Sequence, residues 1–282
     1  MEAPYRRITV AIDGSANALN ATHFAVVMAR ASARLRLLAV VDDVAACLPE
    51  AEGAVVDPGP LLAALADEAD AALRRAQALG EGARLETSSV VMHGRPADCI
   101  LAEAAHADLI VMGTQGRTGV ARVLFGSVAE AVVRQSPVPV VAVHGGDANF
   151  EGPIAVAYDA TPAADAALHE ALRIARAFDV PLIVVHATPD RAAGADPSEP
   201  LAQAARRAAD AGVTVKLVQL RGEAASAVIR AAHAEHARLI VTGTHGHAQI
   251  ERMLIGSVAS GLLERADVPV LSVAPAAIPA TR

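Results

Sequence analysis

Short runs of apolar, β-branched residues alternate along the chain with longer alanine-rich segments whose apolar positions recur at helical spacing. This alternation is typical of parallel strands joined by crossover helices, so the pattern predicts an α/β fold. In the first half we expect strands at residues 7–12, 35–41, 85–92, 108–112 and 138–143, and helices at 16–33, 61–79, 97–105 and 128–135. In the second half we expect strands at residues 154–158, 182–186, 214–220, 239–242 and 268–273.

Several of the predicted strands are apolar on both faces, as in residues 109–112 and 183–185. Continuous apolar strands indicate a sheet that is covered by helices on both sides, and such sheets bind ligands at the carboxyl ends of their strands. Gly80 follows the predicted helix at residues 61–79, and we expect it to end that helix.

The two halves of the chain are copies of each other. The segment VMGTQG, which begins at Val111, returns 130 residues later as VTGTHG, and ITVAID, which ends at Asp13, returns as IAVAYD, which ends at Asp159. Two copies at this spacing indicate a domain duplication rather than a solenoid. We therefore expect one domain at residues 1–144, a glycine-rich linker at 145–153 and a second domain at 154–282.

Each half carries the same glycine pattern directly after its fourth strand. The pattern is G-x-x-G, nine residues and G-S, formed by Gly113, Gly116, Gly126 and Ser127 in the first half and by Gly243, Gly246, Gly256 and Ser257 in the second. Glycines at this position let backbone amides approach an anion, and the helix that follows adds unpaired N–H groups and the positive end of its dipole. An alternative is that Ser127 and Glu130 form only a capping box and the glycines only make turns. The repetition of the pattern favours a phosphate-binding loop.

Composition and charge narrow the classes of function. With 53% hydrophobic and 20% charged residues, the chain has the composition of a globular protein. A net charge of −7 argues against binding of nucleic acid. The sequence has no uninterrupted apolar run of about 18 residues, the length needed to cross a membrane. Its first residues also lack a signal-peptide pattern, so we expect a cytoplasmic protein. Because Lys216 is the only lysine, phosphate contacts must come from arginine, backbone amides or hydroxyls.

These motifs resemble the universal stress protein family, and the likeness covers nearly the whole chain as two tandem domains. Members of that family that carry this loop typically bind ATP, whereas the other main branch lacks the loop. The resemblance implies the ATP-binding branch and a fold of two tandem five-stranded parallel-sheet sandwiches with helices on both faces, similar to adenine nucleotide alpha hydrolase-like and Rossmann-like folds. It also implies that the two domains pair with each other through their last strands as an intramolecular pseudo-dimer, with a homodimer of whole chains as a further possibility.

The resemblance also implies the residues of the first site. The positions that hold the ribose and phosphates match Met112, Gly113, Gln115, Gly116, Arg117, Gly126, Ser127 and Val128. Asp13 matches the acid near the nucleotide, and Val40 matches the position whose backbone reads the adenine edge.

The second half carries the same plan with some departures. The corresponding residues are Asp159, Ala187, Thr242, Gly243, His245, Gly246, His247, Gly256, Ser257 and Val258. His247 stands where the first half has Arg117, and Glu223 stands at the rim where the first half has Arg95. Because an arginine is lost beside the phosphates and an acid is gained, we expect the second site to bind more weakly.

Asp13 and Asp159 each follow a strand, where a carboxylate can hold ribose hydroxyls, help to bind Mg²⁺, or only cap the next helix. The last strand of each half begins near a proline, Pro139 or Pro269, and this predicts a sheet edge. The prolines could serve the proposed pairing of the two edges, or they could act only to block pairing.

The expected function is that of an ATP-binding stress-response or signalling protein, with one adenine nucleotide site per domain and ATP, ADP or AMP as the ligand. Binding alone can shift a conformation or a partner surface, so no chemistry is required. Two alternatives stay open: a slow Mg²⁺-dependent ATPase or phosphotransferase, and an interaction scaffold with a degenerate second site. No catalytic residue is assigned, because no Walker lysine, general base or metal-binding motif can be read.

Overall fold

The computed structural model describes residues 3–30, 32–42, 59–114, 125–145, 150–188, 198–244 and 255–275. The first half contributes β1 (Arg7–Ile12), α1 (Ala16–Ala29), β2 (Arg34–Val41), α2 (Gly59–Gly82), β3 (Glu86–His93), α3 (Pro96–Glu103), the short 3-10 helix η2 (Ala104–His106), β4 (Leu109–Gly113), α4 (Ser127–Gln135) and β5 (Val140–Val143). The second half contributes β6 (Ile154–Ala157), α5 (Pro162–Phe178), β7 (Leu182–Thr188), α6 (Ser198–Asp210), β8 (Val215–Arg221), α7 (Ala224–Ala234), β9 (Leu239–Gly243), α8 (Ser257–Arg265) and β10 (Val270–Val273).

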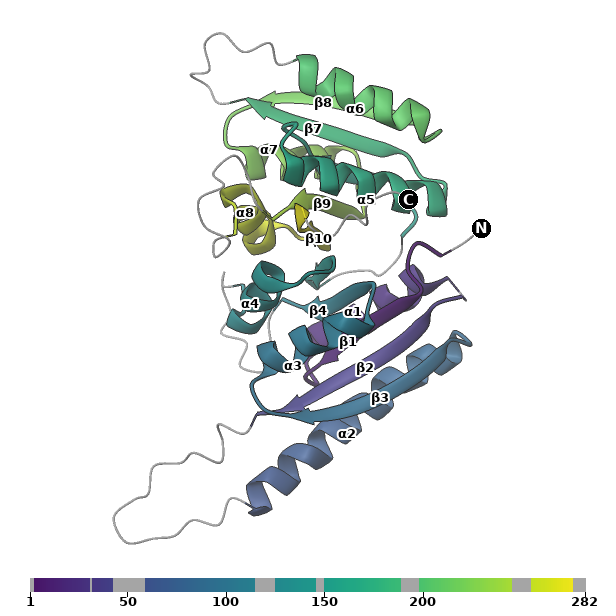
Figure 1. Ribbon diagram of the computed structural model, residues 1–282, viewed down its shortest axis with the longest axis vertical. Coiled ribbons are helices and arrows are strands. Elements are labelled where there is room, and N and C mark those ends of the chain that lie inside the picture. The colour runs from purple at the N-terminus through teal and green to yellow at the C-terminus, as the bar shows by residue number, and fades with distance from the viewer. Residues whose placement is uncertain are drawn as a thin grey trace, which may run out of the picture.

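The strands form one ten-stranded sheet in the order β3-β2-β1-β4-β5-β10-β9-β6-β7-β8 (Figure 1). Within each half the five strands run parallel, which confirms the predicted α/β fold with a parallel sheet in each repeat. Between the halves β5 and β10 pair antiparallel, with Val141 opposite Leu271. The last strands therefore pair with each other, as expected, and the two five-stranded sheets become one.

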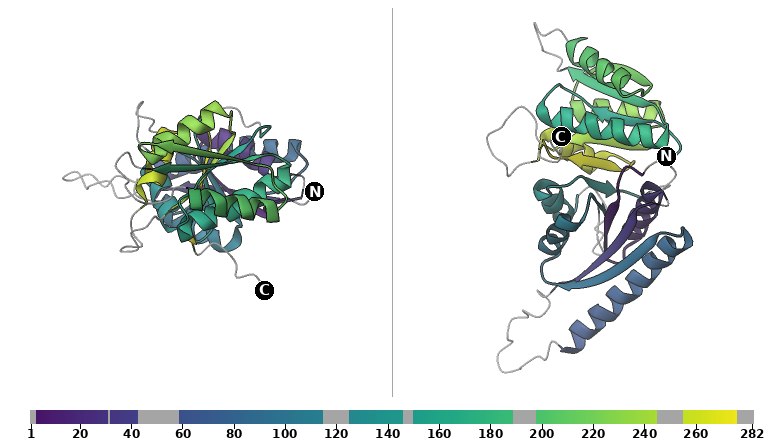
Figure 2. Two further views of the ribbon diagram at one scale, coloured as in Figure 1. Left: turned by 90° about the horizontal axis from the view of Figure 1, so that it is seen from above. Right: turned by 45° about the vertical axis from the view of Figure 1, so that its right-hand side comes forward.

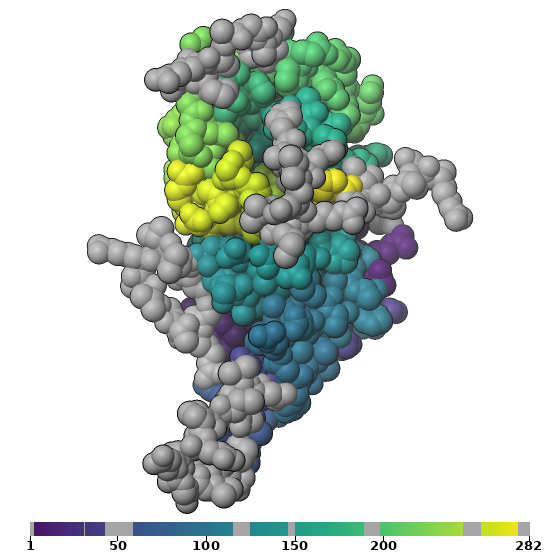
Figure 3. Space-filling model, turned by 60° about the vertical axis from the view of Figure 1, so that its left-hand side comes forward, coloured from purple at the N-terminus to yellow at the C-terminus, as the bar shows by residue number. Residues whose placement is uncertain are grey.

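Helices cover both faces of this sheet (Figure 2). One hydrophobic cluster contains the side chains of Val141 and Leu271 together with α1, α2, α5 and α6. The neighbouring strand residues, Val140 and Val270, belong to a second cluster with α3, α4, α7 and α8. Because successive strand side chains point to opposite faces, a purely apolar strand supplies both clusters at once. Figure 3 shows the halves meeting directly, with the yellow surface of residues 255–275 against the teal surface of residues 125–145.

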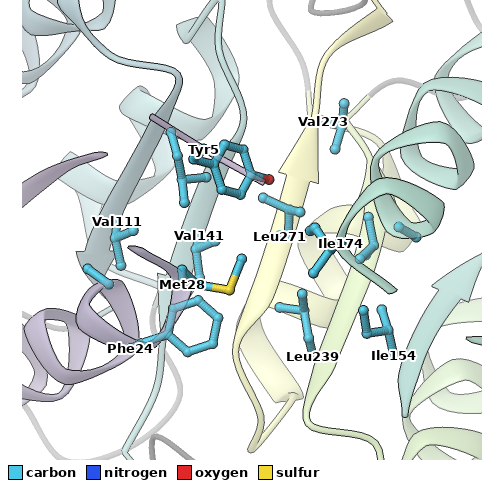
Figure 4. Packing of buried hydrophobic residues seen from close by; sticks show 14 of the residues in the cluster. Tyr5, Phe24, Met28, Val111, Val141, Ile154, Ile174, Leu239, Leu271 and Val273 are labelled. Atoms are coloured by element: carbon cyan, nitrogen blue, oxygen red, sulfur yellow. The ribbon is translucent and has the colours of Figure 1, made fainter. Parts of the chain in front are cut away.

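Buried side chains from both halves interlock where β5 meets β10 (Figure 4). The Phe150 ring lies between two aromatic neighbours, with centroid distances of 6.0 Å to Phe24 and 4.5 Å to Phe178. Tyr5 enters from the other half, where its hydroxyl donates to Glu170 and its ring lies 4.4 Å from the Arg173 guanidinium. The segment that precedes the first strand of each half is thus packed against the first helix of the other half.

The prolines lie just outside the paired segment. Pro139 directly precedes β5, and its carbonyl accepts a hydrogen bond from the Ile110 amide at 3.0 Å, while Pro269 does the same for Ile240 at 3.0 Å. Neither proline has to donate to the ladder, since pairing begins at the next residue. The alternative that these prolines only block pairing is therefore wrong.

Two predicted helix ends are corrected by the structure. α1 ends at Ala29 rather than Ala33, because Arg30 adopts a left-handed conformation with φ of 43°. α2 continues past Gly80 to Gly82, and the left-handed residue that turns the chain is Arg84, with φ of 59°. Gly80 is instead buried within the helix, where a Cβ would collide with the side chains of Thr87 and Leu35. This glycine is present for close packing of helix against sheet, not as a helix stop.

Helix α7 begins at a carboxylate that also ties two helices together. Glu223 accepts hydrogen bonds from the amides of Ala225 and Ser226, at 3.1 and 2.8 Å, and from the Arg265 guanidinium of α8, at 3.0 and 3.1 Å. Hydrogen bonding with Ser226, followed by the contributions of Arg265 and Ala225, lowers the pKa of Glu223 to about 2. The carboxylate is thus a helix cap and one half of an ion pair.

In the part of the chain described above, no helix is long and apolar enough to span a membrane.

The aromatic contact between the halves leads to a prediction for stability. Phe150→Ala should lower the free energy of unfolding by about 3 kcal/mol, because a nearly fully buried ring leaves a cavity between α1 and α5. Urea denaturation of the whole chain measures this. Leu61→Ala is the control, since Leu61 is 42% exposed on α2 and its truncation should cost less than about 1 kcal/mol. Equal losses in the two variants would contradict the role of Phe150.

The cap on α7 leads to a prediction for pH. Glu223→Gln should lower the free energy of unfolding at pH 7 by up to about 1 kcal/mol, a value limited by the solvent exposure of the pair. Because the folded-state pKa lies below the ordinary value of 4.5, this contribution is present above pH 4.5 and fades as the pH falls towards 2. Urea titrations at several pH values test it, with Glu199→Gln as the control on an exposed pair with Arg206. A difference that did not shrink in acid would exclude this linkage.

Candidate functional site

A cavity of about 700 Å³ opens at the carboxyl ends of β1, β2 and β4, against the start of α4 and the side of α2. Seven residues predicted for the first site line it, namely Asp13, Val40, Met112, Gly113, Gly126, Ser127 and Val128. They come from three strand ends and one helix start that are distant in sequence, and the parallel sheet brings those ends to one edge. The remaining predicted residues, Gln115, Gly116 and Arg117, lie outside the described residues.

The second half has a smaller cavity, of about 270 Å³, at the corresponding place. Its lining includes Asp159, Ala187, Thr242, Gly243, Gly256, Ser257 and Val258. The predicted residues His245, Gly246 and His247 lie outside the described residues. Each half therefore gathers its described motif residues around one cavity at the same strand ends.

The acid after the first strand shapes the turn into the first helix. Asp13 Oδ1 accepts from the Ser15 amide at 2.9 Å, and Asp159 Oδ1 accepts from the Thr161 amide and hydroxyl at 3.1 and 2.6 Å. The helix caps themselves are the side chains of Ser15 and Thr161, each of which accepts from an amide three residues on. The alternative that the aspartates only cap the helices is therefore wrong. They hold the turn while their side chains line the cavities.

The helix that follows the glycine pattern begins with a free amide end. Gly126 is the N-cap of α4, with φ of −61° and ψ of 141°, and it makes no side-chain cap hydrogen bond. Gly256 starts α8 in the same way. The alternative of a capping box formed by Ser127 and Glu130 is therefore wrong, since Ser127 is the first residue inside the helix. The amides of the first turn are left for a ligand, which is the usual arrangement of an anion site at a helix N-terminus.

The glycines of the pattern have two different roles. A Cβ at Gly113 would lie 2.8 Å from the Asn17 Cβ, and a Cβ at Gly243 would lie 2.6 Å from the Ala163 backbone. These first glycines therefore let α1 and α5 pack against the strand ends. Gly126 closes the loop instead, because its amide donates to the Thr114 carbonyl at 2.9 Å. Of these two roles, only that of Gly126, at the start of α4, concerns backbone amides beside the cavity.

The two cavities differ because their walls differ. α2 spans Gly59–Gly82 and lines the first cavity with Leu65, Glu68 and Ala69. The shorter α6, which spans Ser198–Asp210, contributes no lining residue to the second. Sequence reasoning missed the α2 residues because an ordinary amphipathic helix carries no motif that would mark them.

In the second half an aromatic side chain replaces Ile12 of the first. The Tyr158 hydroxyl donates to Asp165 at 2.7 Å, and the Arg207 guanidinium holds the same carboxylate at 2.7 and 3.0 Å. Burial and the bond to Asp165 raise the pKa of the Tyr158 hydroxyl. Glu223 was expected to repel phosphate at this rim, but its charge is taken up by α7 and Arg265. Among the described residues, the two sites differ in cavity size, about 700 Å³ against about 270 Å³, and the Glu223 carboxylate is already held by Arg265.

The acidic groups near the first cavity are dispersed. Three acids line it: Asp13 directly after β1, Asp42 directly after β2, and Glu68 on α2. Among the described residues, no three histidine, cysteine, aspartate or glutamate side chains come together as a metal site.

Comparison with known proteins gives the same family for both halves. The family model described as "Universal stress protein family" matches residues 4–144 and 152–274. A universal stress protein of Mycobacterium tuberculosis is 30% identical over 214 residues, which cover 69% of this chain and 71% of that protein. One from Methanocaldococcus jannaschii is 35% identical over 142 residues, which cover 49% of this chain and 82% of that protein.

A solved structure gives the same fold over nearly the whole length. The crystal structure of a universal stress protein from Archaeoglobus fulgidus superposes with a TM-score of 0.77 at 21% identity, and the match covers 95% of this chain and 96% of that one. The duplicated fold, the repeated glycine pattern and the two family matches agree. The chain belongs to the universal stress protein family.

Proposed function

We propose that this chain is an ATP-binding stress-response protein whose principal nucleotide site is the first cavity. The observation that carries the proposal is the convergence of Asp13, Val40, Met112 and the start of α4 on one hollow of about 700 Å³. That volume lies within the range of about 300–1,000 Å³ usual for small-molecule sites. The proposed unit of binding is the domain, with boundaries at 1–144 and 154–282.

Each part of the nucleotide has a matching wall. Leu38, Val40 and Ile100 offer apolar surface to a base, and the carboxylate of Asp13 is an acceptor for ribose hydroxyls. The amides at the start of α4 and the Ser127 hydroxyl are donors for phosphate oxygens. These donors fit a lysine-poor chain, because they supply phosphate contacts without an ammonium group.

The second cavity is proposed as a weaker site for the same class of ligand. It keeps the acid, the helix start and the serine, but it lacks the wall that α2 provides in the first half. ATP bound to either site stabilises whichever conformation holds it better, so the protein can signal by binding alone.

Filling each cavity separately tests both parts of the proposal. Val40→Trp should remove the tight site, because a bulky ring would occupy the place proposed for the base. Ala187→Trp is the matched variant at the corresponding position of the second cavity and should remove only the weaker site. Isothermal titration with Mg·ATP, together with the nucleotide released from freshly purified protein, measures both. Unchanged tight binding in Val40→Trp would refute the assignment of the first cavity.

Removing one phosphate donor should have a graded effect. Ser127→Ala should weaken ATP binding about tenfold, or about 1.4 kcal/mol, because one hydrogen bond to a charged phosphate is lost. Ser260→Ala on α8 is the control, since that hydroxyl donates to Glu264 on the helix surface. If the two variants bound ATP with the same affinity, the start of α4 would not be the phosphate site.

A further inference from the structure

A third hollow lies between the two halves and shares no lining residue with the two cavities at the strand ends. This cleft of about 1,050 Å³ is bordered by the start of β1, by η2, by the residues before β5 and by α5 of the second half. Its charged and titratable lining residues are Arg6, Arg7, Asp108, His169, Arg173 and Arg176 together with the largely buried Glu170. Whereas the nucleotide cavities open at the carboxyl ends of strands, this one lies at the amino ends of β1, β4 and β5. We refer to it as the α5 cleft.

The α5 cleft carries an excess of positive charge in a chain whose net charge is −7. Four arginines and one histidine line it, against two carboxylates. Both carboxylates already have a partner, since Asp108 holds Arg7 at 2.6 Å and Glu170 holds Arg173. Arg176 and His169 are exposed and make no hydrogen bond or ion pair with any described residue. Their donors are therefore available to a ligand.

The first half shows that the fold does not require two arginines at these positions of its first helix. The residues of α1 that correspond to His169, Arg173 and Arg176 are His23, Val27 and Arg30. The Arg30 guanidinium is used for packing, because it donates to the Ala177 carbonyl at 2.6 Å and lies 4.6 Å from the centre of the Phe178 ring.

The two copies have thus diverged in a specific way. Arg173 stands where the first half has Val27, and it holds Glu170 and packs on the Tyr5 ring of the other half. Arg176 differs, because it has no packing role like that of Arg30 and makes no hydrogen bond or ion pair with a described residue. Its guanidinium is therefore left at the α5 cleft for a ligand.

The three basic residues also border a second hollow. A cavity of about 510 Å³ on the side of α5 that faces α6 is lined by His169, Arg173 and Arg176 together with Arg207 and one acid, Asp210. Residues 169 and 176 are about 10 Å apart along the helix axis at 1.5 Å per residue. The basic side chains therefore form a row between two hollows, which suits a ligand with several negative groups more than a single small ion.

We propose that the α5 cleft binds a small anion that carries several phosphate groups, at a site independent of the nucleotide cavities. Arginine guanidinium groups match phosphate oxygens in charge and in hydrogen-bond geometry. The negative net charge of the chain disfavours a long nucleic acid, whose backbone would meet repulsion outside the cleft. The α5 cleft itself is large enough for a compact oligophosphate.

The probe for this site is tripolyphosphate, titrated calorimetrically into the whole chain at constant ionic strength and without Mg²⁺. We expect saturable binding that weakens at least tenfold in the double variant His169→Gln/Arg176→Gln. Both side chains are exposed, so the fold should be retained, and circular dichroism with a thermal melt verifies this. Arg206→Gln is the charge-matched control, because that exposed arginine lies on α6 and pairs with Glu199. Its affinity should stay within twofold of the unmodified protein.

A second pair of variants separates this site from the nucleotide sites. The variant Ser127→Ala/Ser257→Ala should bind tripolyphosphate at the α5 cleft as tightly as the unmodified protein does. The proposal is overturned if tripolyphosphate does not bind saturably, if Arg206→Gln weakens binding as much as the double variant, or if only the serine variants weaken it. None of these results depends on whether ATP binds the first cavity.

Discussion

The antiparallel pairing of β5 with β10 is the contact on which the rest of the molecule depends. Each strand is the edge of a five-stranded parallel sheet, and an unpaired apolar edge would leave backbone groups without partners and expose its side chains. Pairing removes both problems at once, because Val141 and Leu271 are completely buried between helices of the two halves. Phe150, which precedes β6, lies beside Phe24 of α1 and belongs to the same core.

This pairing also explains why the nucleotide cavities and the α5 cleft are separate. Because the strands of each half run parallel, their carboxyl ends lie at one edge, where the described glycines of the pattern and the start of the next helix line the cavity. The amino ends of β1, β4 and β5 are left to border the neighbouring half. There they meet α5, whose exposed Arg176 makes no hydrogen bond or ion pair with a described residue, whereas the matching Arg30 of α1 donates to the Ala177 carbonyl. The fold thus separates the two proposed kinds of site, which share no lining residue.

Much of this was predictable because it depends on local pattern. The apolar strands and the repeat predicted one parallel sheet in each half. The glycine spacing predicted that the ends of the fourth strand and the start of the next helix would line a cavity. The rest depends on contacts between distant segments, which a pattern does not carry. Gly80 was misjudged because its purpose is the approach of Thr87 from another element, and Glu223 because Arg265 lies forty-two residues away. The α2 wall of the first cavity was missed although the helix at residues 61–79 was predicted, because no motif in an amphipathic helix marks the residues that face a cavity.

The duplication makes each departure from symmetry informative, because the two halves share one fold and differ only where something acts on one of them. The second cavity has no wall from α6, and Tyr158, whose hydroxyl donates to Asp165, lines it where Ile12 lines the first. Along α5 the second half has Arg173 and Arg176 where the first half has Val27 and Arg30, and Arg207 of α6 lines the hollow beside them. Arg173 and Arg207 are held by Glu170 and Asp165, so Arg176 is the arginine of this group that makes no ion pair with a described residue.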